Sequence, residues 1–408
     1  MISWSTNKNL RFLSLKMSKK SKNFQDSAKK IYIRTFGCQM NDRDSEALLG
    51  LFVDKGYLIA ESAEEADAVL VNTCSVRAHA EDRARSYLGS LKKKGPVPIR
   101  EQSPKKILGL IGCMAKNKGE ELYERMPYID LICGPASFSK IPEYVKRIKE
   151  EGIRIKDLED KEREEDFYKA AFRQDSDRAQ VIISTGCSNY CSYCIVPFVR
   201  GELRLRKPGD IIDEVKRNIS SGIKNITLLG QNVNDYDFKL KTQYSILNTN
   251  FVDLLKMVNK IEGLESLDFI TSQPKNTSKE LFTLIKKSPK IRKHLHLPFQ
   301  SGSNRILKLM KRGYTREKYL QLVDDYRKIV GGTLSTDVIV GFSTESGEDF
   351  NQTKDILEKV KFSHAFIFKY SPRGATKSVG MADDVAREVK ASRHKILLDL
   401  QKEISLGK

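Results

Sequence analysis

Short runs of hydrophobic residues alternate along the chain with longer segments in which hydrophobic residues recur every three to four positions. In the first part of the chain a helical pattern follows most of the short runs, which lie at 31–36, 68–73, 106–112 and 129–134. This alternation predicts parallel strands joined by helices that cover both faces of a sheet. We therefore expect residues 29–150 to form one parallel α/β domain.

A second series of the same kind follows a charged segment. Its strand candidates lie at 180–184, 225–230, 266–270, 293–297, 334–340 and 364–370. Six βα repeats predict a partial (β/α)6 barrel over residues 173–408, in which function is built from the loops at the carboxyl ends of the strands. The charge-rich residues 151–172 are expected to be a linker, and the polar residues 236–250 a loop insertion.

Charge and hydropathy narrow the class of protein. The chain has 72 Lys and Arg against 53 Asp and Glu, a net charge of +19, which favours a polyanionic partner. A generally lysine-rich composition explains the same charge without such a partner. No run of 18 apolar residues occurs, so we expect no membrane-spanning helix. Residues 1–28 are expected to be a disordered basic tail, or the product of a start site set too early given Met17, rather than a targeting signal.

Three of the seven cysteines lie within eight residues, as Cys187, Cys191 and Cys194. An odd number of cysteines without a secretory segment predicts reduced thiols and a cytoplasmic protein. Thiolates select zinc, copper(I) or iron–sulfur clusters. A structural zinc site needs a fourth ligand, whereas a [4Fe–4S] cluster on three cysteines leaves one iron open to a small chelating molecule. The alternative without metal is that the three thiols pack as small hydrophobic groups.

Three more cysteines, Cys38, Cys74 and Cys113, follow three successive strands predicted for the first domain. Because the carboxyl ends of parallel strands lie at one edge of a sheet, these thiols can converge although they are far apart in sequence. Cysteines scattered through a core would show the same spacing, so this pattern alone leaves both interpretations open.

The spacing CxxxCxxC, with Tyr193 before its last cysteine, resembles the signature of the radical S-adenosylmethionine enzymes. With the words FGCQMN, NTCSVR and GCMA, the chain resembles the methylthiotransferases over residues 30–380. The resemblance implies two [4Fe–4S] clusters and two molecules of S-adenosylmethionine per turnover. One cluster would carry sulfur and the other would generate a radical, so no side chain is assigned as catalytic. The implied ligands are Cys38, Cys74 and Cys113 for the first cluster, and Cys187, Cys191 and Cys194 for the second.

The resemblance also implies a substrate. These words, with LLGQNVNDY, are most similar to the branch that methylthiolates C2 of isopentenylated adenosine at position 37 of the tRNA anticodon loop. A radical step suits this inert aromatic C–H, and a loop allows the base to be splayed out. The alternatives are threonylcarbamoyladenosine in tRNA, an aspartate of a ribosomal protein, or a metal-dependent RNA-binding module without turnover. An electron donor and a sulfur source would be further partners of a monomeric enzyme.

The same resemblance assigns further positions. Groups that bind S-adenosylmethionine or line its cavity are expected at Gly230, Gln231, Asn232, Gln300, Ser301 and Gly302. Cys133 is expected to be structural, because a fourth thiolate would close the iron that must accept sulfur. His294 and His296 are expected to pack and hydrogen-bond within the barrel rather than to bind a metal.

Other features bear on the RNA. Basic stretches at 200–207, 286–294 and 308–319 are candidates for tracking phosphates. Each alone is more typical of a solvated helix or loop face, and only together with the net charge do they favour an RNA partner. The chain departs from the family pattern in ITSQPKN, which lacks a usual histidine, in SPRGATKS, and at Ser343, which replaces a usual proline. We expect the chain to lack the small RNA-binding TRAM barrel that follows the radical domain in relatives.

Overall fold

The computed structural model describes residues 29–76, 78–94, 106–160, 165–169, 172–241 and 246–407. The basic tail expected over residues 1–28 lies outside the described residues. Within the described part of the chain, no helix combines the length and the hydropathy needed to cross a membrane.

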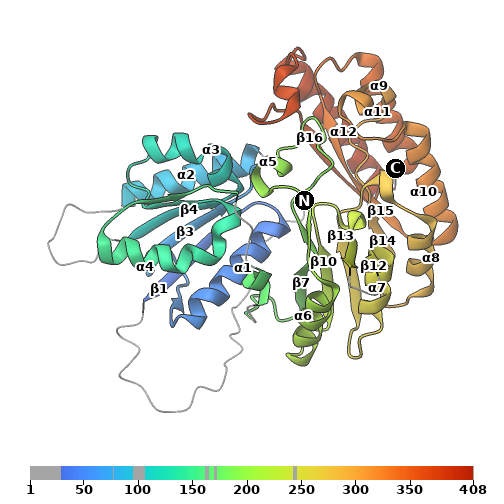
Figure 1. The fold of residues 1–408 in the computed structure, drawn as a ribbon. Coiled ribbons are helices and arrows are strands. Elements are labelled where there is room, and N and C mark those ends of the chain that lie inside the picture. Colours follow the sequence, from blue (N-terminus) through green and yellow to red (C-terminus); the bar gives the residue numbers. More distant parts are fainter. Residues whose placement is uncertain are drawn as a thin grey trace.

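The first domain is a parallel sheet with helices on both faces, as predicted. Its strand order is β2-β1-β3-β4-β5-β6, and all the pairs are parallel. The strands are β1 (Lys30–Phe36), β2 (Leu58–Ile59), β3 (Ala68–Thr73), β4 (Ile107–Gly112), β5 (Leu131–Cys133) and β6 (Ile155–Asp157). The helices α2 (Ala78–Lys94) and α3 (Cys113–Arg125) lie on one face of the sheet, and α1 (Gln39–Asp54) and α4 (Ile141–Glu151) lie on the other (Figure 1). β3 is buried along its whole length because both faces are covered.

The segment 151–172, expected to be a linker, is packed against the first domain in its described parts. It supplies the edge strand β6 and a 3-10 helix, η2 (Glu165–Lys169). Phe167 and Tyr168 of this helix are 1% and 3% exposed and join the core on the α1 and α4 face of the sheet. The high charge of the segment hides this aromatic pair, whose burial draws the connection onto the domain.

The second domain is a six-stranded partial barrel, which confirms the predicted fold class. Its strands form two parallel groups, β13-β10-β7 and β14-β15-β16, joined by a bridge between Leu267 and Ile291. Within the described residues β7 and β16 do not pair, so the barrel is open between them. The strands are β7 (Arg178–Ile182), β10 (Asn225–Leu229), β13 (Ser266–Ile270), β14 (His294–His296), β15 (Thr333–Val340) and β16 (His364–Lys369).

Helices follow the barrel strands and cover the outside of the barrel (Figure 1). They are α6 (Pro208–Ser220), α7 (Phe251–Asn259), α8 (Lys279–Lys287), α9 (Asn304–Leu309), α10 (Arg316–Ile329), α11 (Gly347–Val360) and α12 (Arg387–Ser405). Shorter elements near the cysteines are α5 (Val196–Arg200) and the antiparallel pair β8 (Ser184–Thr185) and β9 (Arg204–Leu205).

The expected loop insertion at 236–250 is instead an antiparallel hairpin of β11 (Asp237–Lys241) and β12 (Ile246–Asn250). Polar and apolar residues alternate in β11, and Phe238 packs against the barrel core while Leu240 is largely exposed. This period of two is the pattern of a half-buried strand, which the polar composition of the segment obscures.

A buried ion-pair network joins the two domains. Glu214 of α6 accepts hydrogen bonds from Arg43 Nη2 at 3.1 Å, Arg173 Nη2 at 2.8 Å and Arg206 Nη1 at 2.6 Å. Arg43 belongs to α1 of the first domain, and its side chain is 0% exposed. Because buried ionised groups require counter-charges, this network fixes how the first sheet meets the barrel.

Candidate functional site

The thiols that follow the first domain's strands meet at one edge of the sheet. β1, β3 and β4 are neighbours, with Phe36, Thr73 and Gly112 in register at their carboxyl ends. Cys74 and Cys113 are the next residues after β3 and β4, and Cys38 lies two residues beyond β1. A hydrogen bond with Cys74 is the main reason that the pKa of Cys38 is lowered to about 6.

Small and amide side chains hold this edge in shape. A Cβ on Gly37 would lie 2.7 Å from the Cβ of Cys74, so only glycine allows this approach. Asn41 accepts a hydrogen bond from Cys38 Sγ at 3.3 Å and donates one to Asn72 Oδ1 at 3.2 Å. Asn72 in turn donates to the backbone carbonyl of Asn41 at 3.0 Å. The loop after β1 is thereby tied to the end of β3.

The second group of thiols lies on the loop between β8 and α5. The backbone N–H of Cys187 donates to Gly201 O at 3.1 Å, and that of Cys194 donates to Cys191 O at 3.0 Å. Asn189 holds the loop to the barrel, because its Nδ2 donates to Asp235 Oδ2 at 2.6 Å and to Cys187 Sγ at 3.5 Å. Burial raises the pKa of Cys194 to about 12, so a metal bound there must displace a proton.

Both groups of thiols border a single cavity of about 630 Å³ between the first domain and the carboxyl end of the barrel. Five of the six predicted ligands line it, namely Cys38, Cys74, Cys187, Cys191 and Cys194. Cys113 is 2% exposed and packs against Ile195, just before α5, and Val199, near the end of α5. Tertiary structure thus brings together cavity-lining cysteines of the two groups that are 113 to 156 positions apart in the sequence.

One buried arginine contacts each group of thiols. Arg200 Nε donates to Cys113 Sγ at 3.2 Å, and Arg312 Nη1 donates to Cys191 Sγ at 3.4 Å. The Arg312 side chain is also held by Pro298 O at 3.1 Å, and the residue is only 7% exposed. Sequence reasoning placed both arginines in basic stretches that face RNA phosphates. The structure corrects this, because each guanidinium is turned inward onto a thiol.

The donor set suits clusters better than a single ion. No group of three or more His, Cys, Asp or Glu side chains in the described part of the chain is placed to hold a metal ion. In a [4Fe–4S] cluster each thiolate ligates a different iron, so its three thiols stand further apart than the ligands of one ion. Thiols supplied three at a time, each set beside a buried guanidinium, fit such an anionic group.

The predicted S-adenosylmethionine positions divide into two kinds. Gln231, Asn232 and Gln300 line the cavity. The Asn232 amide is already engaged with Gln273, to which it donates at 3.1 Å. Gln300 has a left-handed backbone, with φ 66°.

The other three predicted positions do not line the cavity. Gly230 is buried where β10 ends, and a Cβ there would lie 2.6 Å from Ser184 Oγ. Ser301 and Gly302 face α11, where the Gly302 N–H donates to Thr353 Oγ1 at 2.9 Å. Ser301 and Gly302 thus pack the loop after β14 onto α11, and a contact of these three residues with cofactor stays a prediction.

Sequence reasoning missed several cavity residues. Asn189, Arg312 and Asp337 line the cavity together with Thr271, Ser272 and Gln273. Position at the carboxyl end of a barrel strand was the available signal for the run after β13, whereas Asp337 lies within β15 and carried no such signal.

The rim of the cavity carries basic side chains from both domains. His79 of α2 and Lys369 at the end of β16 are exposed there, and Arg373 bridges to Glu81 of α2 at 3.3 Å. Lys377 lies close enough to Lys311 to lower its pKa, so two ammonium groups share one patch of surface. The basic stretch 286–294 lies elsewhere, because it precedes β14 and so belongs to the opposite end of the barrel.

The remaining singled-out residues have local partners. Cys133 is 0% exposed in the core on the α1 and α4 face, does not line the cavity, and its Sγ donates to Gly134 O at 3.4 Å. His294 and His296 hydrogen-bond to Ser335 Oγ, each at 2.9 Å. These contacts support the structural roles expected for all three side chains.

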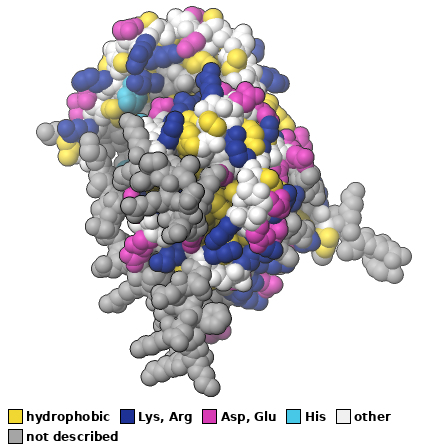
Figure 2. Space-filling view, turned by 90° about the vertical axis from the view of Figure 1, so that its left-hand side faces the viewer, with side chains coloured by type: hydrophobic (Ala, Val, Ile, Leu, Met, Phe, Trp, Pro, Cys, Tyr) yellow, Lys and Arg dark blue, Asp and Glu magenta, His cyan; other side chains and the backbone are white. Residues whose placement is uncertain are grey.

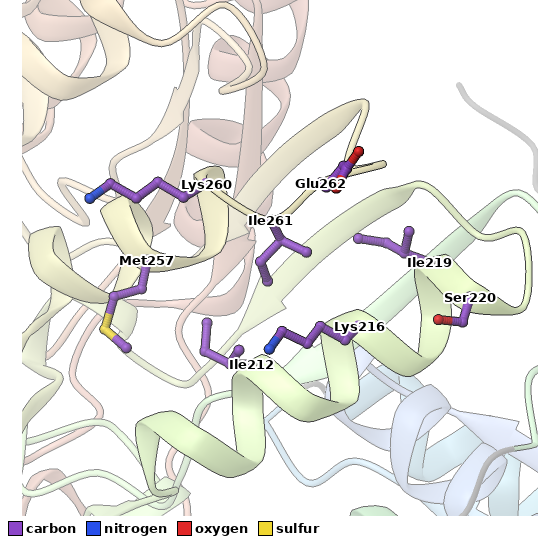
Figure 3. A pocket seen from close by; sticks show the side chains of 8 residues that line it. All are labelled: Ile212, Lys216, Ile219, Ser220, Met257, Lys260, Ile261 and Glu262. Carbon is purple, nitrogen blue, oxygen red and sulfur yellow. The ribbon is translucent and has the colours of Figure 1, made fainter.

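A second hollow, of about 580 Å³, lies on the outside of the barrel between α6 and α7 (Figure 3). Its walls are mainly aliphatic, with Lys216, Lys260 and Glu262 at the margin. No cysteine lines it, so its composition offers no group for the chemistry of the first cavity.

Comparisons with known proteins decide the family. Residues 30–134 match the model described as uncharacterized protein family UPF0004, and residues 181–357 match the radical SAM superfamily. The tRNA-2-methylthio-N(6)-dimethylallyladenosine synthase of Natranaerobius thermophilus is 41% identical over 382 residues, covering 93% of this chain and 82% of that relative. This chain belongs to the same family. The synthase of that name from Clostridium beijerinckii is 42% identical, covering 92% of this chain and 81% of its own length.

Solved structures with low identity to this synthase-family chain share its fold. The radical S-adenosylmethionine methyltransferase TsrM from Kitasatospora setae matches with a TM-score of 0.58 at 14% identity, covering 85% of this chain and 77% of its own. The cobalamin-dependent S-adenosylmethionine radical enzyme OxsB matches with a TM-score of 0.53 at 11% identity, covering 92% and 56%. The order of an α/β domain followed by a radical SAM barrel is therefore common to these proteins.

Proposed function

We propose that this protein is a tRNA methylthiotransferase that places a methylthio group at C2 of N6-isopentenyladenosine at position 37 of the anticodon loop. One observation carries the proposal: five cysteines of the two sets of three, from two domains, line a single cavity, and the sixth, Cys113, is buried beside α5. A cavity that presents both sets to one substrate suits the replacement of C–H by C–S–CH3. The names of the relatives supply the nucleoside.

Cys38, Cys74 and Cys113 would hold one [4Fe–4S] cluster, and Cys187, Cys191 and Cys194 the other. Bound there, the clusters and S-adenosylmethionine supply a sulfur atom, a methyl group and a 5′-deoxyadenosyl radical. The protein's own task is to keep water out and to orient the reactants. Cys74, Cys113 and Cys191 are each less than 9% exposed, and this burial helps to keep water away from the clusters.

Polar and apolar parts of the cavity wall are assigned to different ligands. Gln231 and Gln300 are the polar groups that we assign to S-adenosylmethionine, beside the loop of Cys187. Apolar surface from Val76, Ala78 and Ile339 faces the same space and suits the hydrocarbon chain of an isopentenylated base. At about 630 Å³ the cavity is in the range of small-molecule sites.

The basic rim is the proposed tRNA contact. His79, Lys369 and Arg373 line the cavity, where phosphates flanking an extruded base would pass, and Lys311 with Lys377 forms a further basic pair. On the described surface that faces the viewer in Figure 2, Lys and Arg are mixed with acidic side chains. An electron donor and a sulfur source would act with a monomeric enzyme in the cytoplasm.

Nucleoside analysis tests the proposal. Bulk tRNA from cells with and without this gene is digested and separated by liquid chromatography with mass detection. We expect the methylthiolated isopentenyladenosine to vanish on deletion while isopentenyladenosine accumulates. The full chain should restore it, and Cys38→Ala and Cys191→Ala chains should not. An unchanged methylthio nucleoside in the deletion strain would refute the proposed substrate.

A further inference from the structure

A basic and aromatic hollow lies beside the cavity of the thiols. It has a volume of about 450 Å³, and all its lining residues belong to β1 and α2 of the first domain. The groups that matter most for binding are Arg34, Phe36, Arg83 and Tyr87. We call this space the Phe36 hollow. His79 lines both the Phe36 hollow and the cavity, so the two spaces adjoin.

Two arginines lie over the Phe36 ring. The guanidinium carbon of Arg34 is 5.6 Å from the ring centroid, and that of Arg83 is 5.3 Å from it. The Tyr87 ring is 5.7 Å from the same centroid, at an interplanar angle of 60°. Phe36 itself is buried, whereas Arg83 is exposed and Arg34 is half-buried. Two planar guanidinium groups held against aromatic rings therefore form part of the wall.

The charge of the Phe36 hollow is not neutralised by its neighbours. Neither Arg34 nor Arg83 forms an ion pair with a residue that the structure describes. Asp82 also lines the hollow, but its Oδ1 lies 3.8 Å from Nη1 of Arg85, which does not line it. The hollow therefore keeps an excess of positive charge, which suits a polyanion such as a nucleic acid.

The position of the Phe36 hollow selects a neighbour of the substrate base. Cys38, which lines the cavity, follows Phe36 by two residues, so their Cα atoms are at most about 7 Å apart. A base extruded into the cavity leaves the adjacent bases of its strand near the cavity mouth. Unpaired bases of RNA loops are recognised by stacking on aromatic side chains and guanidinium planes. The hollow offers both kinds of group at this place.

We propose that the Phe36 hollow is a nucleotide-binding subsite, in which Arg34 and Arg83 stack on the base next to the one that enters the cavity. The subsite rests on the proposed function, because it requires an RNA loop as substrate. Stacking there holds the loop in an open form and so keeps the target base in the cavity. It tolerates different bases, because every base has a π-face, but it requires that a base be present.

RNA binding by the full, anaerobically reconstituted chain tests the subsite. One probe is a synthetic anticodon stem-loop with isopentenyladenosine in its loop, and two further probes lack the base on the 5′ or the 3′ side of that nucleotide. Dissociation constants are measured by fluorescence anisotropy at several salt concentrations. The parent chain is compared with a chain carrying Arg34→Lys and Arg83→Lys, which keeps both charges and removes both planar groups.

The matched control is a chain carrying Arg125→Lys and Arg147→Lys. These arginines lie on α3 and α4 of the same domain and line neither the Phe36 hollow nor the cavity. Both are exposed, and each pairs with a glutamate one helical turn away, Arg125 with Glu121 at 2.5 Å and Arg147 with Glu151 at 3.0 Å. The control therefore repeats the same chemical change away from the proposed subsite.

We expect the parent to bind one of the two abasic probes about tenfold more weakly than the intact stem-loop, as loss of one stacked base predicts. The Arg34→Lys, Arg83→Lys chain should bind the intact stem-loop about tenfold more weakly than the parent does, and the missing base should no longer matter to it. Its salt dependence should match that of the parent, because the number of positive charges is unchanged. The control chain should bind all three probes like the parent.

Equal affinity of the parent for all three probes would overturn the subsite, whatever the variants do. Parent-like binding of the intact stem-loop by the Arg34→Lys, Arg83→Lys chain would also overturn it, and would leave the hollow to a protein partner. If the parent binds and methylthiolates the stem-loop but ignores the neighbouring bases, only this inference fails. If the parent neither binds nor methylthiolates the stem-loop, the proposed function fails with it.

Discussion

Glu214 offers the sharpest test of how the two domains are held together. Its carboxylate is 2% exposed and accepts hydrogen bonds from three arginines at 2.6 to 3.1 Å. Glu214→Gln keeps the size and shape of the side chain but removes its charge. Arg43, Arg173 and Arg206 would then share one neighbouring carboxylate, Glu46, which two of them already contact.

The expected cost follows from the burial of these groups. Breaking a buried ion pair by neutralising one partner destabilises a protein by about 3–5 kcal/mol, because the other charge stays desolvated. At about 2–4 °C per kcal/mol for a domain of this size, the melting temperature should fall by roughly 6–20 °C. The matched control is Glu265→Gln in an exposed pair with Lys224, which should cost less than about 1 kcal/mol.

Thermal unfolding of both variants, followed by circular dichroism on cluster-free protein, measures the difference. Burial acts to raise the pKa of Glu214, but Arg206, Arg43 and Arg173 outweigh it and lower the pKa. Its stabilisation is therefore present above the unfolded value of about 4.3 and is lost as pH falls through the lower folded value. The difference in melting temperature between the wild type and Glu214→Gln should therefore become smaller below about pH 4. A Glu214→Gln protein that melts within a degree of the wild type at pH 7 would refute the reasoning.

Three further predictions concern the thiols. Cys187→Ala, Cys191→Ala and Cys194→Ala should abolish S-adenosylmethionine cleavage, whereas the same change at Cys38, Cys74 or Cys113 should spare 5′-deoxyadenosine formation and stop methylthiolation. Equal cleavage in both sets contradicts this division. Gly37→Ala should lose about four irons, because the new Cβ meets Cys74, while Gly89→Ala, with open space around it, should retain them. Cys133→Ala should keep its iron and activity and lose about 1 kcal/mol of stability, and a fall in iron content would make it a ligand.

Local sequence determined the elements and the nearby ligands. Apolar runs and helical periodicity predicted the parallel domain and the six barrel strands, because each reflects the environment of one strand or helix. The spacing of Cys187, Cys191 and Cys194 was informative for the same reason. One loop carries all three, so their short separation along the chain keeps them close in any fold. Composition was a poorer guide, and it hid the buried Phe167 and Tyr168 and the hairpin at 237–250.

Tertiary structure alone decided the rest. The convergence of Cys38, Cys74 and Cys113 depends on strand order, and their meeting with the second group depends on how the domains pack. The inward direction of Arg200 and Arg312 could not be predicted, because partners distant in sequence determine where a guanidinium points. Arg200 is held by Asp44 and Cys113. Arg312 is held by Pro298 and Cys191. A sequence records which groups are available, whereas burial decides which of their charges must be paired, and only the folded chain supplies that burial.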